Sequence, residues 1–124
     1  MSPEALKKLR YKQGQALMLN APEGFQLGIG TQDSLNEKYD FALLFAKNAA
    51  EVEEWVPKVI PALNEDAVFW ISYPKQSSKI KSDINRDVIW KMIDANTDYT
   101  LVSNVAIDET WSALRVRRKD KVKK

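Results

Sequence analysis

Short apolar runs, each bounded by polar or turn-forming residues, recur along the chain and are separated by two stretches with helical spacing. The runs predict five strands, at residues 16–19, 40–46, 67–73, 99–107 and 110–117. The second and third runs are almost continuously apolar, which is typical of parallel strands covered on both faces. Only two residues separate the last two runs, so these strands must form an antiparallel hairpin.

Two patterns predict helices between these strands. Asn48 and Glu51 have the spacing of a capping box, and apolar residues then recur every three or four positions. Pro57 removes one backbone donor from this helix, so a kink is expected there. A second helix is predicted to begin at Asp83 or Asn85. With elements in this order, the expected fold class is α/β: a three-layer sandwich of about five strands, mostly parallel, ending in an antiparallel hairpin.

Composition bounds the size and the chemistry of the protein. The chain has 124 residues, with 44% hydrophobic and 29% charged residues, as expected for one globular domain. It contains no cysteine and no histidine, which excludes disulfides, thiolate catalysis, Cys-ligated metals and the usual general base near neutral pH. The sequence therefore favours a protein that is not an enzyme, and no cofactor or metal is expected. The lack of a long apolar run or a signal peptide predicts a cytoplasmic protein with no membrane partner.

Positive charge is concentrated at the C-terminus. The net charge is +2, and the last ten residues hold seven basic residues and one acid, which leaves 12 basic and 16 acidic residues in the body. We expect residues 1–117 to form a single α/β domain and residues 118–124 to be a basic, flexible tail. The tail suggests weak nucleic-acid binding as one alternative, although the acidic body argues against nucleic acid as a partner.

The expected topology brings three loops to the carboxyl edge of the sheet, where open α/β sheets bind ligands. One loop follows the first strand, one follows the third, and one connects the last two. Their side chains, with the start of the second helix, are the candidate ligand-binding residues: Asn20, Glu23, Gly24, Lys75, Ser77, Ser78, Lys79, Asn85, Arg86, Asp108, Thr110 and Trp111. Cationic and hydroxyl donors beside a helix start suit a phosphate or carboxylate. The alternative is a solvated loop that only caps a helix.

The four tryptophans divide into two groups. Trp55 and Trp70 lie on core patterns. Trp90 and Trp111 could border the cleft and stack on a planar ligand, or they could cover a sheet edge or an oligomer contact. The first strand could itself be an exposed edge at which a second copy or a partner chain pairs. No residue is assigned a catalytic role.

Several segments resemble known proteins. Residues 39–45, 64–71 and 99–117 look like the fourth to seventh strands of the class I, S-adenosylmethionine-dependent methyltransferase fold. More closely, the chain is similar to a family of short bacterial proteins of unknown function, through residues 19–25, 73–75 with 78–79, 83–87 with Trp90, and 105–115. The resemblance implies a reduced, Rossmann-like fold and brings no known activity. The Gly-rich turn and the ribose-binding acid of methyltransferases have no counterpart here, so S-adenosylmethionine binding is not expected.

Three classes of function follow from the sequence. The favoured hypothesis is a non-catalytic or cryptic α/β domain that binds a small anion, such as phosphate, or a protein partner, with homo-oligomerisation as one form of the latter. The first alternative is a small transferase-type enzyme that uses the carboxyl-edge cleft. The second alternative is weak nucleic-acid binding through the basic tail.

Overall fold

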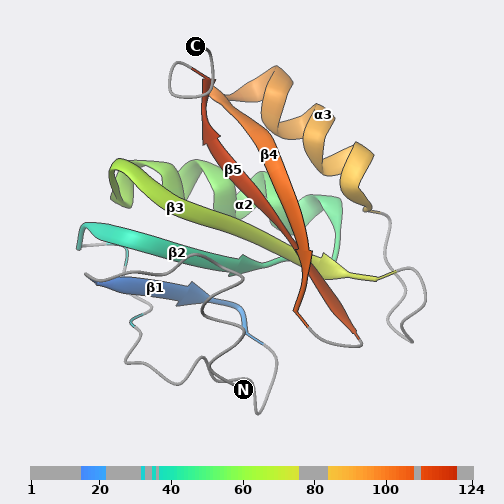
Figure 1. The fold of residues 1–124 in the computed structure, drawn as a ribbon, viewed down its shortest axis with the longest axis horizontal. Helices are drawn as coiled ribbons and strands as arrows, with labels where there is room; N and C mark the ends of the chain where they lie inside the picture. Colours follow the sequence, from blue (N-terminus) through green and yellow to red (C-terminus); the bar gives the residue numbers. More distant parts are fainter. Residues whose placement is uncertain are drawn as a thin grey trace.

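The computed structural model describes residues 15–21, 32, 35, 37–75, 84–107 and 110–119. In chain order, its elements (Figure 1) are β1 (Ala16–Leu19), β2 (Tyr39–Phe45), α2 (Ala49–Val59), the 3₁₀ turn η1 (Ile60–Ala62), β3 (Leu63–Pro74), α3 (Arg86–Asn96), β4 (Tyr99–Ala106) and β5 (Trp111–Arg118). The five strands and two helices of the described residues overlap the segments that the apolar patterns predict, although β3 begins at Leu63, four residues before the predicted run.

The five strands form one mixed sheet in the order β1-β2-β3-β5-β4. The β1–β2 and β2–β3 pairs are parallel, whereas β5 is antiparallel to both of its neighbours, β3 and β4. β5 is therefore inserted between β3 and β4 and does not lie at the edge of the sheet (Figure 1). The terminal β4–β5 hairpin that the sequence predicts is confirmed.

The expected fold class is wrong in two respects. First, the sheet is not mostly parallel: half of its four interfaces are antiparallel, and more residues are paired in antiparallel than in parallel register. The prediction treated the hairpin as an appendage at the end of a parallel sheet. Because β5 lies between β3 and β4, the hairpin contributes two antiparallel interfaces in place of one.

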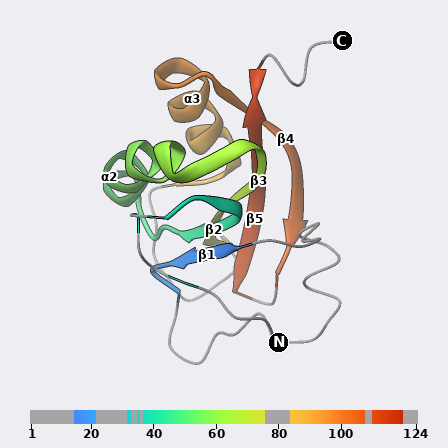
Figure 2. The ribbon, with the colours of Figure 1, turned by 90° about the vertical axis from the view of Figure 1, so that its left-hand side faces the viewer.

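Second, the described chain has no third layer. Figure 2 shows α2 and α3 on the same side of the sheet. The β2–α2–β3 and β3–α3–β4 connections both advance in the same direction along the strand order. Right-handed crossovers that advance in one direction place their helices on one face, and a doubly covered sheet needs a reversal of direction. The Rossmann-like, methyltransferase-like interpretation is therefore also wrong for this chain.

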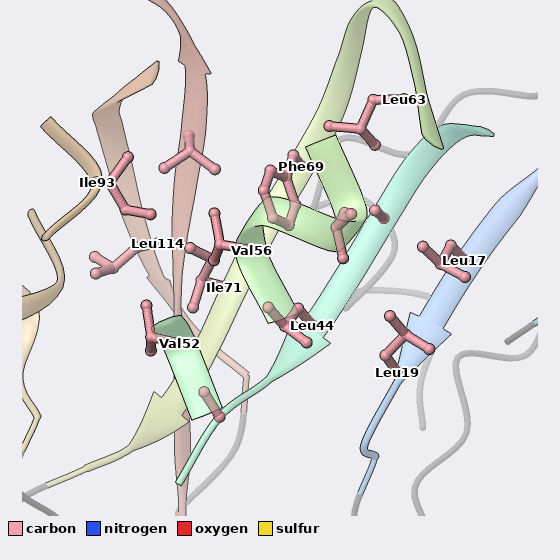
Figure 3. Close-up of a cluster of buried hydrophobic side chains, with 14 of the residues drawn as sticks. Leu17, Leu19, Leu44, Val52, Val56, Leu63, Phe69, Ile71, Ile93 and Leu114 are labelled. Carbon is pink, nitrogen blue, oxygen red and sulfur yellow. The ribbon is translucent and has the colours of Figure 1, made fainter. Parts of the chain in front are cut away.

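Two apolar clusters lie on the two faces of the sheet. The larger cluster packs the buried side of both helices against the strands, and Val52, Val56 and Ile93 meet Phe69 and Leu114 there (Figure 3). The second cluster lies on the opposite face and contains no residue from the described helices. It is built from Ala16, Phe41, Leu43, Phe45, Trp70, Trp111 and Ala113. Burial on both faces explains why the central strands are apolar at nearly every position.

Side-chain caps fix where both helices begin. Asn48 accepts a hydrogen bond from the Glu51 amide at 2.9 Å, and Glu51 in turn accepts one from the Lys47 amide at 2.7 Å. These contacts confirm the predicted start of α2. Asn85, and not Asp83, caps α3, because its side-chain oxygen accepts from the Val88 amide at 3.0 Å. No helix of the described residues is long and apolar enough to cross a membrane.

Candidate functional site

Two of the three predicted loops meet at the carboxyl edge of the sheet. β4 is antiparallel to β5, which is antiparallel to β3, so the last residues of β4 and of β3 lie at the same edge. The Lys75 amide donates to the Thr110 carbonyl at 2.7 Å, which joins the loop after β3 to the hairpin turn. This contact confirms that the topology brings these two segments together.

Six predicted site residues lie in the described part of the chain, and several of them have structural roles. Asn20 ends β1 in the left-handed region at φ 60°. The oxygen of Asn85 is occupied by the α3 cap. Arg86 lies 3.8 Å from Asp87, and both side chains are largely exposed, so this pair adds little stability. The other predicted residues fall outside the described ranges: Glu23, Gly24, Ser77, Ser78, Lys79 and Asp108.

Trp111 is a core residue at this edge. Its side chain is 3% exposed, and its ring meets Phe45 in an edge-to-face contact with centroids 5.0 Å apart. Trp111 pairs with Pro74 across the β3–β5 ladder, which fixes its place in the second apolar cluster. Its ring therefore has little surface left for stacking on a ligand. Trp70 is fully buried, as the sequence predicts.

The end of β2 also reaches the carboxyl edge, although its residues are not among the predicted site residues. The Ala46 amide donates to the Ser72 carbonyl at 2.9 Å, which places Lys47 and Asn48 beside the end of β3. The capping pattern located these residues on a helix start, and parallel pairing with β3 would have placed them at this edge. Lys47 is exposed, and it adds one more cation to the predicted set.

A different surface of the described chain also holds a hollow. A groove of about 560 Å³ runs between α2 and α3 and ends at the start of β4. Its lining is mainly apolar, and the lining residues are Val52, Glu53, Val56, Pro57, Ile60, Pro61, Met92, Ile93, Asn96, Thr97, Asp98 and Tyr99. Its volume is within the range of roughly 300–1,000 Å³ that small-molecule sites occupy.

Polar groups surround this groove at its rim. Thr97 is fully engaged by α3 and β4, because its hydroxyl lies 2.7 Å from the Ile93 carbonyl and 3.0 Å from the Tyr99 amide. The exposed side chains of Glu53 and Asp98 form no ion pair with any described residue. The groove thus combines an apolar floor with two carboxylates that remain available to a cationic group.

The predicted basic tail begins inside the folded part of the chain. Arg118 is the last residue of β5. The Lys119 amide donates to the Asp98 carbonyl at 2.8 Å, and the Lys119 ammonium donates to the Asp94 carbonyl at 2.8 Å. A cation at the last carbonyls of α3 also favours the helix dipole. Residues 120–124 lie outside the described ranges, so nucleic-acid binding through the tail stays a prediction.

Neither a metal site in the described residues nor a similar known protein indicates which ligand or reaction this chain is suited to. Among the described residues, no three acidic side chains gather as a metal site would require. No family model and no curated protein matches the chain. The expected resemblance to a short bacterial family with a Rossmann-like fold is therefore wrong, because no family model matches and the sheet is mixed.

Proposed function

We propose that this protein is a non-catalytic binding domain whose ligand lies in the groove between α2 and α3. The observation that supports this most directly is the groove itself, an open hollow of about 560 Å³ over a rigid apolar core. Burial of apolar ligand surface against such a lining contributes about 25 cal/mol per Å². The cytoplasmic location expected from the sequence is part of the same proposal.

The charges at the rim select the chemical class of the ligand. Glu53 on α2 and Asp98 before β4 flank an apolar floor that includes Pro57 and Met92. Unpaired carboxylates repel an anion and attract a cation, whereas the floor needs a hydrocarbon body. The ligand that suits this surface is a small amphiphile with an apolar body and a cationic group.

A titration with decyltrimethylammonium below its micelle concentration tests this proposal. Amide chemical shifts followed by NMR should change for groove residues such as Ile60 and Met92 and stay constant along β5. The affinity should fall about two- to thirtyfold when both rim charges are removed by Glu53→Gln and Asp98→Asn, because each exposed charge contributes about 0.2–1 kcal/mol. Met92→Gln should weaken binding of charged and uncharged amphiphiles alike.

Glu54→Gln is the matched control for the rim variants. It removes the same charge from the next residue of α2, but Glu54 lies outside the groove and faces Lys58 at 3.6 Å. Its affinity for the probe should equal that of the unmodified protein. Decyl sulfate is the matched ligand with the opposite charge. Equal or tighter binding of decyl sulfate, or shift changes confined to other surfaces, would refute the groove proposal.

The carboxyl edge supports a second candidate function, the binding of a small anion such as phosphate. The hydrogen bond from Lys75 to Thr110 is the observation that favours it, because it brings two predicted loops together beside a lysine. Inorganic phosphate should then raise the melting temperature by mass action, and Lys75→Ala and Arg86→Ala should abolish that rise. Lys91→Ala, an exposed charge in mid-α3, is the control. A melting temperature that phosphate leaves unchanged would rule this candidate out.

A further inference from the structure

β4 forms an edge of the sheet that the described chain leaves open. It pairs with β5 on one side only, and four of its residues are exposed: Val102, Ser103, Asn104 and Ala106. No described residue makes a backbone hydrogen bond to the outer side of β4. Residues 99–106 also include no charged side chain or proline, which are the usual means of blocking an edge. The β-bulge between Leu101 and Ser103 is the only such device in the strand.

Trp90 of α3 lies beside this edge. Its side chain is 45% exposed, and with Val102, at 37%, it is one of the two large hydrophobic residues exposed in the described chain. Met92, two residues further on, lines the groove towards α2. Residues two apart on a helix are separated by about 200°, so Trp90 faces away from α2. α2 packs over β2 and β3, and hence the opposite side of α3 is the side of β4 (Figure 2).

Trp90 and Val102 lie at about the same level along the sheet. Trp90 precedes the end of α3 by six residues, which is about 9 Å of helix at 1.5 Å per residue. Val102 follows the start of β4 by three residues, which is about 10 Å of strand at 3.3 Å per residue. Because α3 and β4 run in opposite directions and are joined at Thr97–Asp98, Trp90 lies beside the exposed middle of β4.

The side of α3 that carries Trp90 has a self-complementary charge pattern. Arg86 and Asp94 lie four residues before and four residues after Trp90, so the three form one stripe along the helix. Two copies of this stripe in antiparallel orientation place each Arg86 beside the other copy's Asp94, with the two tryptophans at the centre. Both charges are accessible: Arg86 is 66% exposed, and Asp94, which also lies 3.5 Å from Lys119, is 47% exposed.

We propose that the α3–β4 surface, defined by Arg86, Trp90, Asp94 and the open edge of β4, binds a second copy of this chain about a two-fold axis. A two-fold interface uses the same patch on both subunits, and this patch is complementary to itself. The neutral edge of β4 can approach a second β4 without opposing like charges. The interface lies on the opposite side of α3 from the groove, so the dimer leaves the proposed ligand site open.

Sedimentation of charge variants gives a test that is specific for this geometry. Arg86→Glu opposes two carboxylates at both cross-subunit pairs of a homodimer, and Asp94→Arg opposes two guanidinium groups at both pairs, so each variant alone should be monomeric. An equimolar mixture of the two variants should dimerise again, because both cross-subunit pairs then have opposite signs. Glu54→Arg on α2 makes the same change in charge as Asp94→Arg away from this surface and should dimerise like the unmodified protein.

Trp90→Ser tests the apolar centre of the interface. A buried tryptophan at an interface centre is typically a hot spot, so its loss should raise the dimer dissociation constant by about 30-fold or more. Circular dichroism should show the same fold for all variants, because each changed side chain is exposed. An unmodified protein that stays monomeric to about 1 mM would overturn the proposal. So would a dimer that survives Trp90→Ser, or a mixture of the two charge variants that stays monomeric.

Discussion

The two edge strands of the sheet differ in burial and in whether their outer side is paired. At one edge, β1 is buried, with Leu17 at 1% and Leu19 at 5% exposed, and Gln32 pairs with its outer side. The Met18 amide donates to the Gln32 carbonyl and the Gln32 amide donates to the Ala16 carbonyl, both at 2.9 Å. At the other edge, the middle of β4 is exposed and has no described partner on its outer side. The sheet is therefore closed at β1 and can be extended at β4.

This difference bears on one possibility that the sequence raises. The first strand could be an exposed edge, and in the structure Gln32 pairs with its outer side. The composition of the two strands agrees with their positions. Residues 16–19 are entirely apolar, as in a buried strand, whereas β4 mixes Thr100, Ser103 and Asn104 with apolar residues. A polar strand late in the chain was the better signal for an open edge.

The largest expected difference between the edges is the loss in free energy of unfolding when an apolar side chain in each edge strand is shortened. Leu17→Ala leaves a cavity in the main cluster and should lower the free energy of unfolding by about 2–5 kcal/mol. Val102→Ala removes a similar apolar group from an exposed position and should change it by no more than about 0.5 kcal/mol. Urea unfolding at a concentration where the chain is monomeric measures both values. Equal losses would mean that the two edges are equally buried in solution.

Local patterns predicted the elements of this fold better than their arrangement. Apolar runs located all five strands, and the asparagines at 48 and 85 marked the helix starts. Periodicity describes the neighbours of a residue along the chain and contains nothing about which strand lies beside which. The position of β5 between β3 and β4 depends on contacts between residues about 40 positions apart, such as the hydrogen bond that the Ser72 hydroxyl donates to the Ser112 carbonyl at 3.0 Å. The resulting mixed sheet was therefore not foreseen.

The two candidate sites also differ in how far the sequence could predict them. The carboxyl edge could be predicted in part, because the end of a parallel strand is visible in the sequence, and Lys75 and Thr110 do meet there. The groove could not, because Pro57 and Met92 come from helices that are far apart in sequence. One feature of the sequence does point to the groove. The buried residues of α3 are Ile89 and Ile93, and the apolar residues Val88 and Met92 lie beside them. The apolar side of the helix is therefore wider than contact with the sheet alone requires.

A smaller loss of stability is expected when a backbone hydrogen bond at the β1 edge is removed and the core side chains are kept. Gln32→Pro removes the amide that donates to the Ala16 carbonyl, and Ala16 is 3% exposed. A buried carbonyl left without a donor costs about 1–3 kcal/mol, so the free energy of unfolding should fall by that amount. The Met18 amide, which donates to the Gln32 carbonyl, should also exchange faster with solvent deuterium.

Gln32→Ala is the matched control, because it keeps both backbone hydrogen bonds and loses only the exposed side-chain contact to Gln15 at 3.0 Å. Its cost should be about 0.5 kcal/mol, within the range of surface substitutions. If the proline and alanine variants were equally stable, the pairing of Gln32 with β1 would contribute nothing. β1 would then be an open edge like β4, and a second copy could bind at either end of the sheet. A clear gap between the two variants leaves β4 as the open edge of the described sheet, which is the edge that the proposed dimer uses.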